Sequence, residues 1–170
     1  MNKEIFWEMI EISKSVLSKT VKDGNLERQA ESVKHQLMGF EKSEVLEYAK
    51  ILHELKLNLY TWELWGAAYV MGGGCSDDSF SDFRCWVISL GKEGYELALT
   101  NPDGLCEFSQ DPTVEDFFFE EFSYIADEVF EDRFGDEIDI EYSRLSEPKG
   151  KEWDEDKVEG LYPKLAELYA

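Results

Sequence analysis

The sequence has few of the residues that carry metal, redox or disulfide chemistry. Its 170 residues include three cysteines, Cys75, Cys85 and Cys106, and two histidines, His35 and His53. The odd number of cysteines and the lack of a Cys-x-x-Cys pair predict reduced, mostly buried thiols rather than a disulfide framework. Neither histidine has a cysteine or carboxylate at a metal-ligand spacing, so we expect no zinc site.

Motifs that would mark an enzyme are also missing. There is no Gly-x-Ser-x-Gly elbow, no EF-hand spacing, and no Lys-Ser or Lys-Thr after the three glycines at 72–74. A thiol enzyme based on Cys75 is disfavoured, because the nearby carboxylates of Asp77 and Asp78 oppose a lowered thiol pKa. We therefore expect a non-catalytic protein that needs no cofactor and no metal.

The chain lacks a long apolar run and a basic leader followed by an apolar segment. These absences argue against a membrane span and against secretion by a standard signal, so we expect a cytoplasmic protein. A hydrophobic content of 43% and an aromatic content of 14% are typical of a folded chain. The length predicts a single domain over residues 1–170.

Positive charge is scarce. The net charge is −21, and it is unevenly distributed along the chain. Residues 1–100 carry 16 acids and 11 bases, whereas residues 101–170 carry 22 acids and 6 bases. Such a surface repels phosphate backbones and anionic lipids, so we expect no nucleic-acid and no membrane partner. Solubility is the simplest explanation of this charge. A basic protein partner and mimicry of nucleic acid are the alternatives.

What is present is helical periodicity. The expected helices cover residues 3–19, 26–38, 44–55, 59–71 and 77–90, a short segment ending at Asn101, and residues from Asp111 or Thr113 to Phe134. Residues 59–71 are apolar almost all round and predict a buried central helix. Residues 136–153 predict an extended arm and 161–169 a short final helix. The fold class is all-α, a single compact multi-helix bundle.

The segment between the central helix and the next one is the stretch most suggestive of a site. Three glycines at 72–74 can end the first helix, and Ser76 can cap the second, with Asp77 and Asp78 in its first turn. The simplest reading is a helix–loop–helix corner. The alternatives are a small-ligand or peptide pocket and a metal site formed by Asp77, Asp78 and Asp82.

Arg84 lies among apolar neighbours and needs a partner. Asp77 or Asp78, one to two turns earlier, is the nearest candidate. One reading is a structural clamp across the loop. The other is an anion-binding arginine at the mouth of a pocket. The tentative ligand-binding residues of this corner are Trp65, Gly73, Gly74, Ser76, Asp77, Asp78, Arg84 and Trp86.

These residues also form a long pattern, G-G-x-S-D-D-x-F-x-x-F-R-x-W over Gly73–Trp86, preceded by W-x-L-W-x-A-A-Y from Trp62. The pattern resembles an uncharacterised bacterial family, domain of unknown function 4240. Phe6-Trp7, the N-P-D at 101–103 and a late W-D-E…Y-P-x-L over 153–165 also look like that family. The resemblance implies no activity, so no catalytic residue is carried over.

Three functions follow as hypotheses. The first is a binding or interaction module whose acidic surface meets a basic partner. The second is a ligand-binding domain or enzyme that uses Asp77, Asp78 and Arg84. The third is an immunity or antitoxin-like protein that binds a basic toxin.

Overall fold

The computed structural model describes residues 1–109 and 117–170, and all of its regular structure is helical. The α-helices are α1 (Lys3–Lys14), α2 (Asn25–Leu37), α3 (Lys42–Asn58), α4 (Trp62–Gly72), α5 (Asp77–Ser89), α6 (Lys92–Thr100), α7 (Ile125–Phe134), α8 (Val158–Leu161) and α9 (Pro163–Tyr169). The 3-10 helices are η1 (Pro102–Glu107), η2 (Glu120–Ser123) and η3 (Glu155–Lys157). The described residues contain no strand, so the predicted all-α fold is confirmed.

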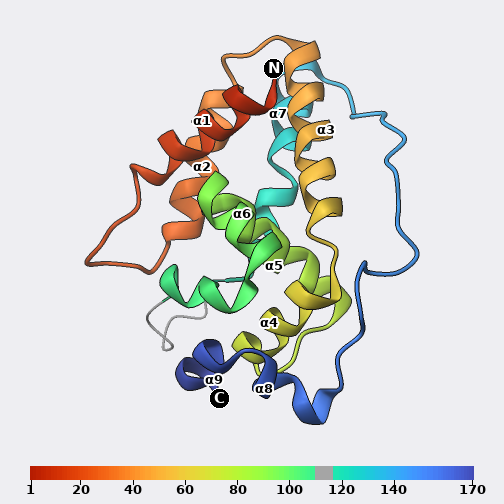
Figure 1. The fold of residues 1–170 in the computed structure, drawn as a ribbon. Coiled ribbons are helices and arrows are strands. Elements are labelled where there is room, and N and C mark those ends of the chain that lie inside the picture. Colours follow the sequence, from red (N-terminus) through yellow and green to blue (C-terminus); the bar gives the residue numbers. More distant parts are fainter. Residues whose placement is uncertain (110–116) are drawn as a thin grey trace.

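Helix α5 lies in the middle of the molecule, where it packs against α3, α4, α6 and η2 (Figure 1). Its side chains Phe80 and Phe83 are fully buried, as are Phe117, Phe119 and Phe122 from the chain before α7. Complete burial of one such apolar side chain contributes about 1.5–3 kcal/mol. The aromatic core therefore supplies much of the driving force for folding.

Helix α4 is the buried central helix that the sequence predicts. It begins at Trp62 rather than at residue 59, because the Thr61 side chain accepts a hydrogen bond from the N–H of Leu64 and caps the helix there. Its buried residues are Leu64, Gly66, Ala67, Ala68, Val70 and Met71. Such a small-residue surface lets other elements approach the helix backbone closely.

The corner between α4 and α5 has the predicted caps. Gly73 adopts a left-handed conformation with φ 61°, and its N–H donates to the carbonyls of Tyr69 and Val70 at the end of α4. The Ser76 side chain accepts from the N–H of Ser79, so Ser76 is the N-cap of α5. Local capping chemistry is therefore sufficient to explain this turn.

Besides the start of α4, other predicted helix boundaries are wrong within the described residues. Helix α1 ends at Lys14 rather than at Lys19, because the Ser15 hydroxyl bonds back to the carbonyl of Ile12 and the chain turns away. The expected helix start at Asp111 or Thr113 lies outside the described residues.

Residues 117–119 were also expected to be helical, and they are not. The N–H of Phe119 instead donates to the carbonyl of Asp82 on α5 at 3.1 Å, and the Phe119 ring is buried. A tertiary contact has thus overridden the helical periodicity of this segment, and α7 begins only at Ile125.

Between α7 and η3 the chain forms no helix or strand and descends along α3 (Figure 1). This is the arm predicted for residues 136–153. His53 Nε2 lies 2.6 Å from the Ser143 carbonyl, and the N–H of Lys149 donates to the carbonyl of Tyr60 at 2.9 Å. The Trp153 indole N–H donates to the Trp62 carbonyl at 2.8 Å. A few contacts therefore fasten the arm to the α3–α4 region.

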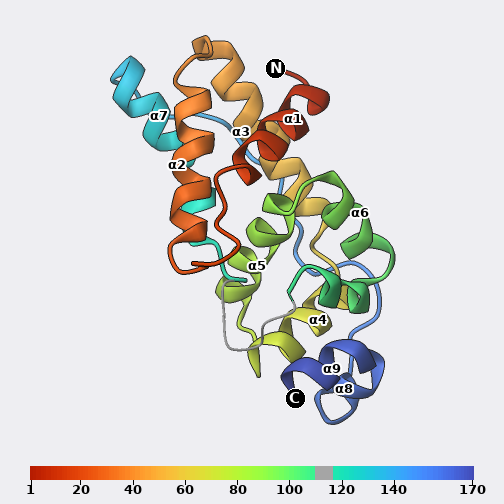
Figure 2. The same cartoon turned by 90° about the vertical axis from the view of Figure 1, so that its left-hand side faces the viewer.

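The C-terminal helices pack on α4 and η1, at the end of the molecule away from α7 (Figure 2). The Tyr162 hydroxyl donates to the Glu63 carbonyl at 2.6 Å. Asp103 of the N-P-D sequence accepts hydrogen bonds at 3.0 Å from the N–H groups of Lys164 and Leu165, at the start of α9. The N-P-D motif thus anchors the last helix.

Candidate functional site

The residues predicted to share one site are divided among several places. Trp65 is a packing residue: its ring stacks on Phe80 with centroids 5.0 Å apart, and its indole N–H donates to the Cys75 carbonyl at 2.9 Å. Gly73, Gly74 and Ser76 form the turn. Asp78 is exposed and makes no hydrogen bond to a described residue. Asp77 and Arg84 line one groove, and Trp86 lines a different pocket.

Arg84 does not pair with Asp77 or Asp78, so that expectation is wrong. Its Nη1 donates to the carbonyl of Lys56, in the last turn of α3, at 3.0 Å, and its Nε donates to the Phe80 carbonyl at 3.3 Å. In the described part of the chain, no carboxylate lies within 4.0 Å of the guanidinium. Two backbone carbonyls, one on α3 and one on α5, therefore accept hydrogen bonds from the guanidinium, and no carboxylate neutralises its charge at close range.

The metal site considered for Asp77, Asp78 and Asp82 is not formed either. Over residues 1–109 and 117–170, no three His, Cys, Asp or Glu side chains gather closely enough to hold an ion. Asp82 lies nearer to other acids: burial, followed by the charge of Glu120, raises the pKa of its carboxyl group.

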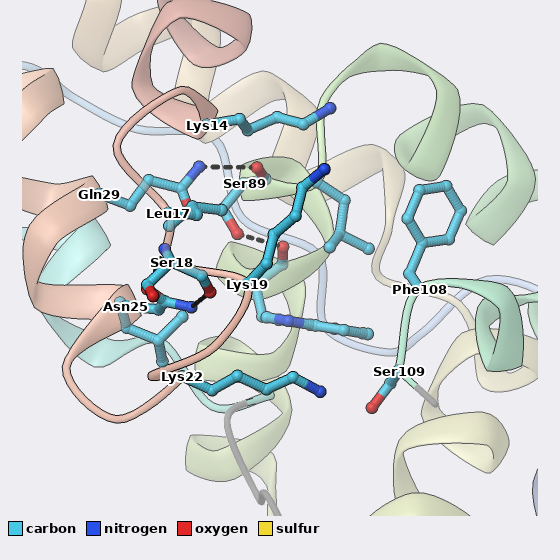
Figure 3. A pocket seen from close by; sticks show the side chains of 13 residues that line it. Lys14, Leu17, Ser18, Lys19, Lys22, Asn25, Gln29, Ser89, Phe108 and Ser109 are labelled. Atoms are coloured by element: carbon cyan, nitrogen blue, oxygen red, sulfur yellow. Dashed lines mark hydrogen bonds between the residues drawn. The ribbon is translucent and has the colours of Figure 1, made fainter. Parts of the chain in front are cut away.

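A pocket of about 460 Å³ lies between the α1–α2 loop, α5 and the segment after η1 (Figure 3). Its lining residues are Lys14, Leu17, Ser18, Lys19, Lys22, Asn25, Leu26, Gln29, Trp86, Ser89, Leu90, Phe108 and Ser109. We call it the lysine pocket. Its volume is in the range of small-molecule sites.

Charge distinguishes the lysine pocket from the rest of the protein. Acids outnumber bases 38 to 17 in the chain, yet the described lining has three lysines and no carboxylate. The side chains of Lys14, Lys19 and Lys22 extend from one side toward Phe108 on the other (Figure 3). Their ammonium groups therefore place three positive charges beside one hollow of a strongly acidic chain.

The lysines differ in their surroundings. Lys14 pairs with Glu11 on the same helix, with Nζ 3.0 Å from Oε2, so a carboxylate stands just outside the lining. Lys19 is exposed and makes no ion pair or hydrogen bond to a described residue. Of these two cations, Lys19 is the one that is readily available to a ligand.

The wall of the pocket is rigid and partly apolar. Gln29 is 2% exposed, and its amide donates to the Ser89 carbonyl at 2.8 Å and to the Ser13 hydroxyl at 3.1 Å. These bonds join α1, α2 and the end of α5. Trp86 and Phe108 add aromatic surface. The pocket thus combines lysine side chains with aromatic surface and a buried, hydrogen-bonded amide.

Sequence reasoning found Trp86 but missed the lysines. The sequence signal that could have indicated them is their spacing. Lys14, Lys19 and Lys22 lie within nine residues of a strongly acidic chain. Their convergence depends on the early end of α1 and on the loop that follows it, which Ser18 and Asn25 close by hydrogen bonds at 2.9 and 3.0 Å.

Comparisons with known proteins identify a family and nothing more specific. No curated protein and no solved structure matches the chain. Among the described residues, no helix is both long and apolar enough to cross a membrane. The model of a family described as protein of unknown function (DUF4240) matches residues 1–132, so the late W-D-E…Y-P-x-L sequence lies outside the match. The chain, matched over most of its length, belongs to this DUF4240 family, as its central pattern indicated.

Proposed function

We propose that this protein is a non-catalytic binding protein that holds a small organic anion in the lysine pocket. The single observation that carries the proposal is the gathering of Lys14, Lys19 and Lys22 around one hollow in a chain of net charge −21. The acidic surface as a whole repels anions, so a local group of cations favours their binding at the pocket.

The lining also favours a class of ligand. Ammonium groups bind phosphate or carboxylate oxygens through charge-assisted hydrogen bonds. Trp86 and Phe108 offer apolar surface to a flat or hydrophobic group. We therefore propose an aromatic or otherwise apolar molecule that carries a phosphate or carboxylate group, with the acidic group toward Lys19 and the apolar part toward Trp86.

Calorimetric titration with 1-naphthyl phosphate tests this proposal. Naphthalene methanol, which lacks the charge, and inorganic phosphate, which lacks the rings, are the matched ligands. We expect 1-naphthyl phosphate to bind more tightly than either, and its affinity to fall with salt. Lys19→Ala should weaken binding by about 3- to 10-fold, which is roughly 0.7–1.4 kcal/mol.

Lys50→Ala is the control, because Lys50 is an exposed lysine on α3 that pairs with Glu47 away from the pocket. It removes the same charge from the protein and should leave affinity within about 1.5-fold. Equal losses in Lys19→Ala and Lys50→Ala would contradict the proposal, as would the absence of binding at millimolar ligand.

A basic protein partner is a second candidate, favoured by the 22 acids and 6 bases of residues 101–170. A basic toxin neutralised by this protein would be one such partner. The three free cysteines fit a cytoplasmic setting for either function. Pull-downs at low and high salt test the idea: a basic partner captured at low salt and released at high salt supports it, and no partner under either condition contradicts it.

A further inference from the structure

A second hollow carries an inference that is independent of the lysine pocket. A groove of about 330 Å³ lies between α3, α5 and the arm. Its lining residues are His53, Lys56, Leu57, Tyr60, Asp77, Ser81, Arg84, Ser143, Arg144 and Leu145. We call it the Arg84 groove. Three of its side chains are permanently cationic, and one is a carboxylate.

Arg84 is a partly buried cation of this groove that has no ion-pair partner among the described residues. Its guanidinium lies over the rings of Tyr60 and Phe80, with centroid distances of 4.7 and 5.0 Å. Nε and Nη1 donate to backbone carbonyls, whereas Nη2 makes no hydrogen bond to a described residue. Burial lowers the pKa of Arg84, the expected response of a cation removed from water.

No carboxylate of the described lining forms an ion pair with Arg84, although the charge of Asp77 acts on the guanidinium from a longer distance. Asp77, the one carboxylate of the described lining, accepts a hydrogen bond from the Tyr60 hydroxyl at 3.3 Å. The Lys56 ammonium donates to the hydroxyls of Ser81 and Ser123 at 3.0 and 3.1 Å, and forms no ion pair with a described residue. Asp82, whose carboxyl group interacts electrostatically with Lys56, lies outside the described lining of the groove.

A partly buried guanidinium without a carboxylate is costly, and an added oxyanion would offset that cost. The guanidinium also has the planar fork that suits phosphate or carboxylate oxygens. We propose that the Arg84 groove binds a compact oxyanion, a free phosphate or carboxylate group, with Arg84 as its principal ligand and Lys56 and Arg144 as supporting cations.

Arg144 gives the proposal a consequence beyond binding. It belongs to the arm, whose neighbouring Ser143 carbonyl is held by His53 on α3. An oxyanion shared by Arg84 and Arg144 would join the arm to α5. Binding should therefore protect the arm, and trypsin offers a direct readout because it cuts after Arg144.

The test is a titration with sodium phosphate, and separately with sodium acetate, at constant ionic strength. We expect a saturable shift of the Arg84 Nε–Hε NMR signal, assigned by its loss in Arg84→Lys, and slower tryptic cleavage after Arg144. Arg144→Ala should weaken binding at least threefold. Lys151→Ala, an exposed lysine of the same arm outside the groove, and Lys19→Ala in the lysine pocket should not.

Several results would overturn the proposal. The Arg84 signal could fail to shift with both anions, or its shift could fail to saturate. Equal weakening in Arg144→Ala and Lys151→Ala would show a general charge effect. Loss of the phosphate response in Lys19→Ala would assign the oxyanion to the lysine pocket instead. Failure of the Arg84 groove proposal can therefore be distinguished from failure of the proposed function. A response to phosphate alone, or to acetate alone, identifies the oxyanion.

Discussion

Replacing Gly66 with alanine should destabilise the protein, although alanine is the better helix former. Gly66 is buried on α4 beneath the ring of Tyr162. A Cβ at this position would lie 2.5 Å from the Tyr162 hydroxyl oxygen, 2.7 Å from Cε2 and 2.8 Å from Cζ. The ring must therefore move, and its hydrogen bond to the Glu63 carbonyl is lost with it.

The magnitude follows from three opposing effects. Overpacking a closed site costs about 1–3 kcal/mol. Loss of the Tyr162 hydrogen bond costs about 1 kcal/mol more. Replacing a helical glycine with alanine returns about 1 kcal/mol. We expect a net loss of about 2 kcal/mol in the free energy of unfolding, which corresponds to a fall in Tm of roughly 4–8 °C for a chain of this size.

Urea and thermal unfolding followed by circular dichroism measure this loss. Gly160→Ala is the matched control, because Gly160 is an exposed glycine on α8 with no atom within 4 Å of an added Cβ, and it should be neutral or slightly stabilising. Tyr162→Leu should rescue Gly66→Ala in a double-mutant cycle with a coupling of at least about 1 kcal/mol. Indistinguishable effects of the two glycine substitutions would refute the packing of Tyr162 on α4.

Three further predictions address the corner and its neighbours. Ser76→Ala should lower the unfolding free energy by about 1 kcal/mol in urea denaturation, whereas Ser76→Asp should not, because only a side-chain acceptor caps α5. Asp82→Asn should raise the free energy of unfolding at pH 7 by about a few tenths of a kcal/mol after solvent screening, since burial and Glu120 raise the pKa of Asp82 in the folded state above its ordinary 3.8. The gain, measured by urea denaturation, should vanish at pH 3, where Asp82 is largely protonated in both states. Burial raises the pKa of Cys75 to about 12, so iodoacetamide should label this thiol slowly at pH 8. Because the thiol ionises at a lower pH in the unfolded state, Cys75 should lower the free energy of unfolding as pH rises above about 9.

The predictable parts of the fold were those set by neighbouring residues. The corner between α4 and α5 depends on Gly73 and Ser76, whose capping roles are local, and both were correctly identified. The apolar circumference of α4 predicted its burial. The all-α class followed from helical periodicity along most of the chain.

The parts that could not be predicted depend on contacts distant in sequence. The charge of Arg84 indicated the need for a partner, but its acceptor is a backbone carbonyl of Lys56, which carries no sequence signal. Phe119 is not helical, although its sequence had suggested a helix, because its N–H donates to the backbone carbonyl of Asp82. Lys19 reaches the lysine pocket only because α1 ends early. Local patterns thus located the corner, whereas tertiary packing determined the two hollows.

Beyond the residues that match the family, the chain still contributes to the same packing. Tyr162 covers Gly66, and Trp153 donates to the Trp62 carbonyl. The N-P-D sequence inside the matched region caps α9 outside it through Asp103. We therefore expect changes in this C-terminal segment to alter the stability of α4.

The central claim, that the lysine pocket binds an organic anion, is tested most directly by an NMR titration of the five tryptophan indole N–H signals with 1-naphthyl phosphate. The account predicts a saturable shift of the Trp86 signal, with Trp62, Trp65 and Trp153 unaffected, because only Trp86 among these four lines the pocket. A Trp86 signal that stays in place, or equal shifts of all the indoles, would contradict it.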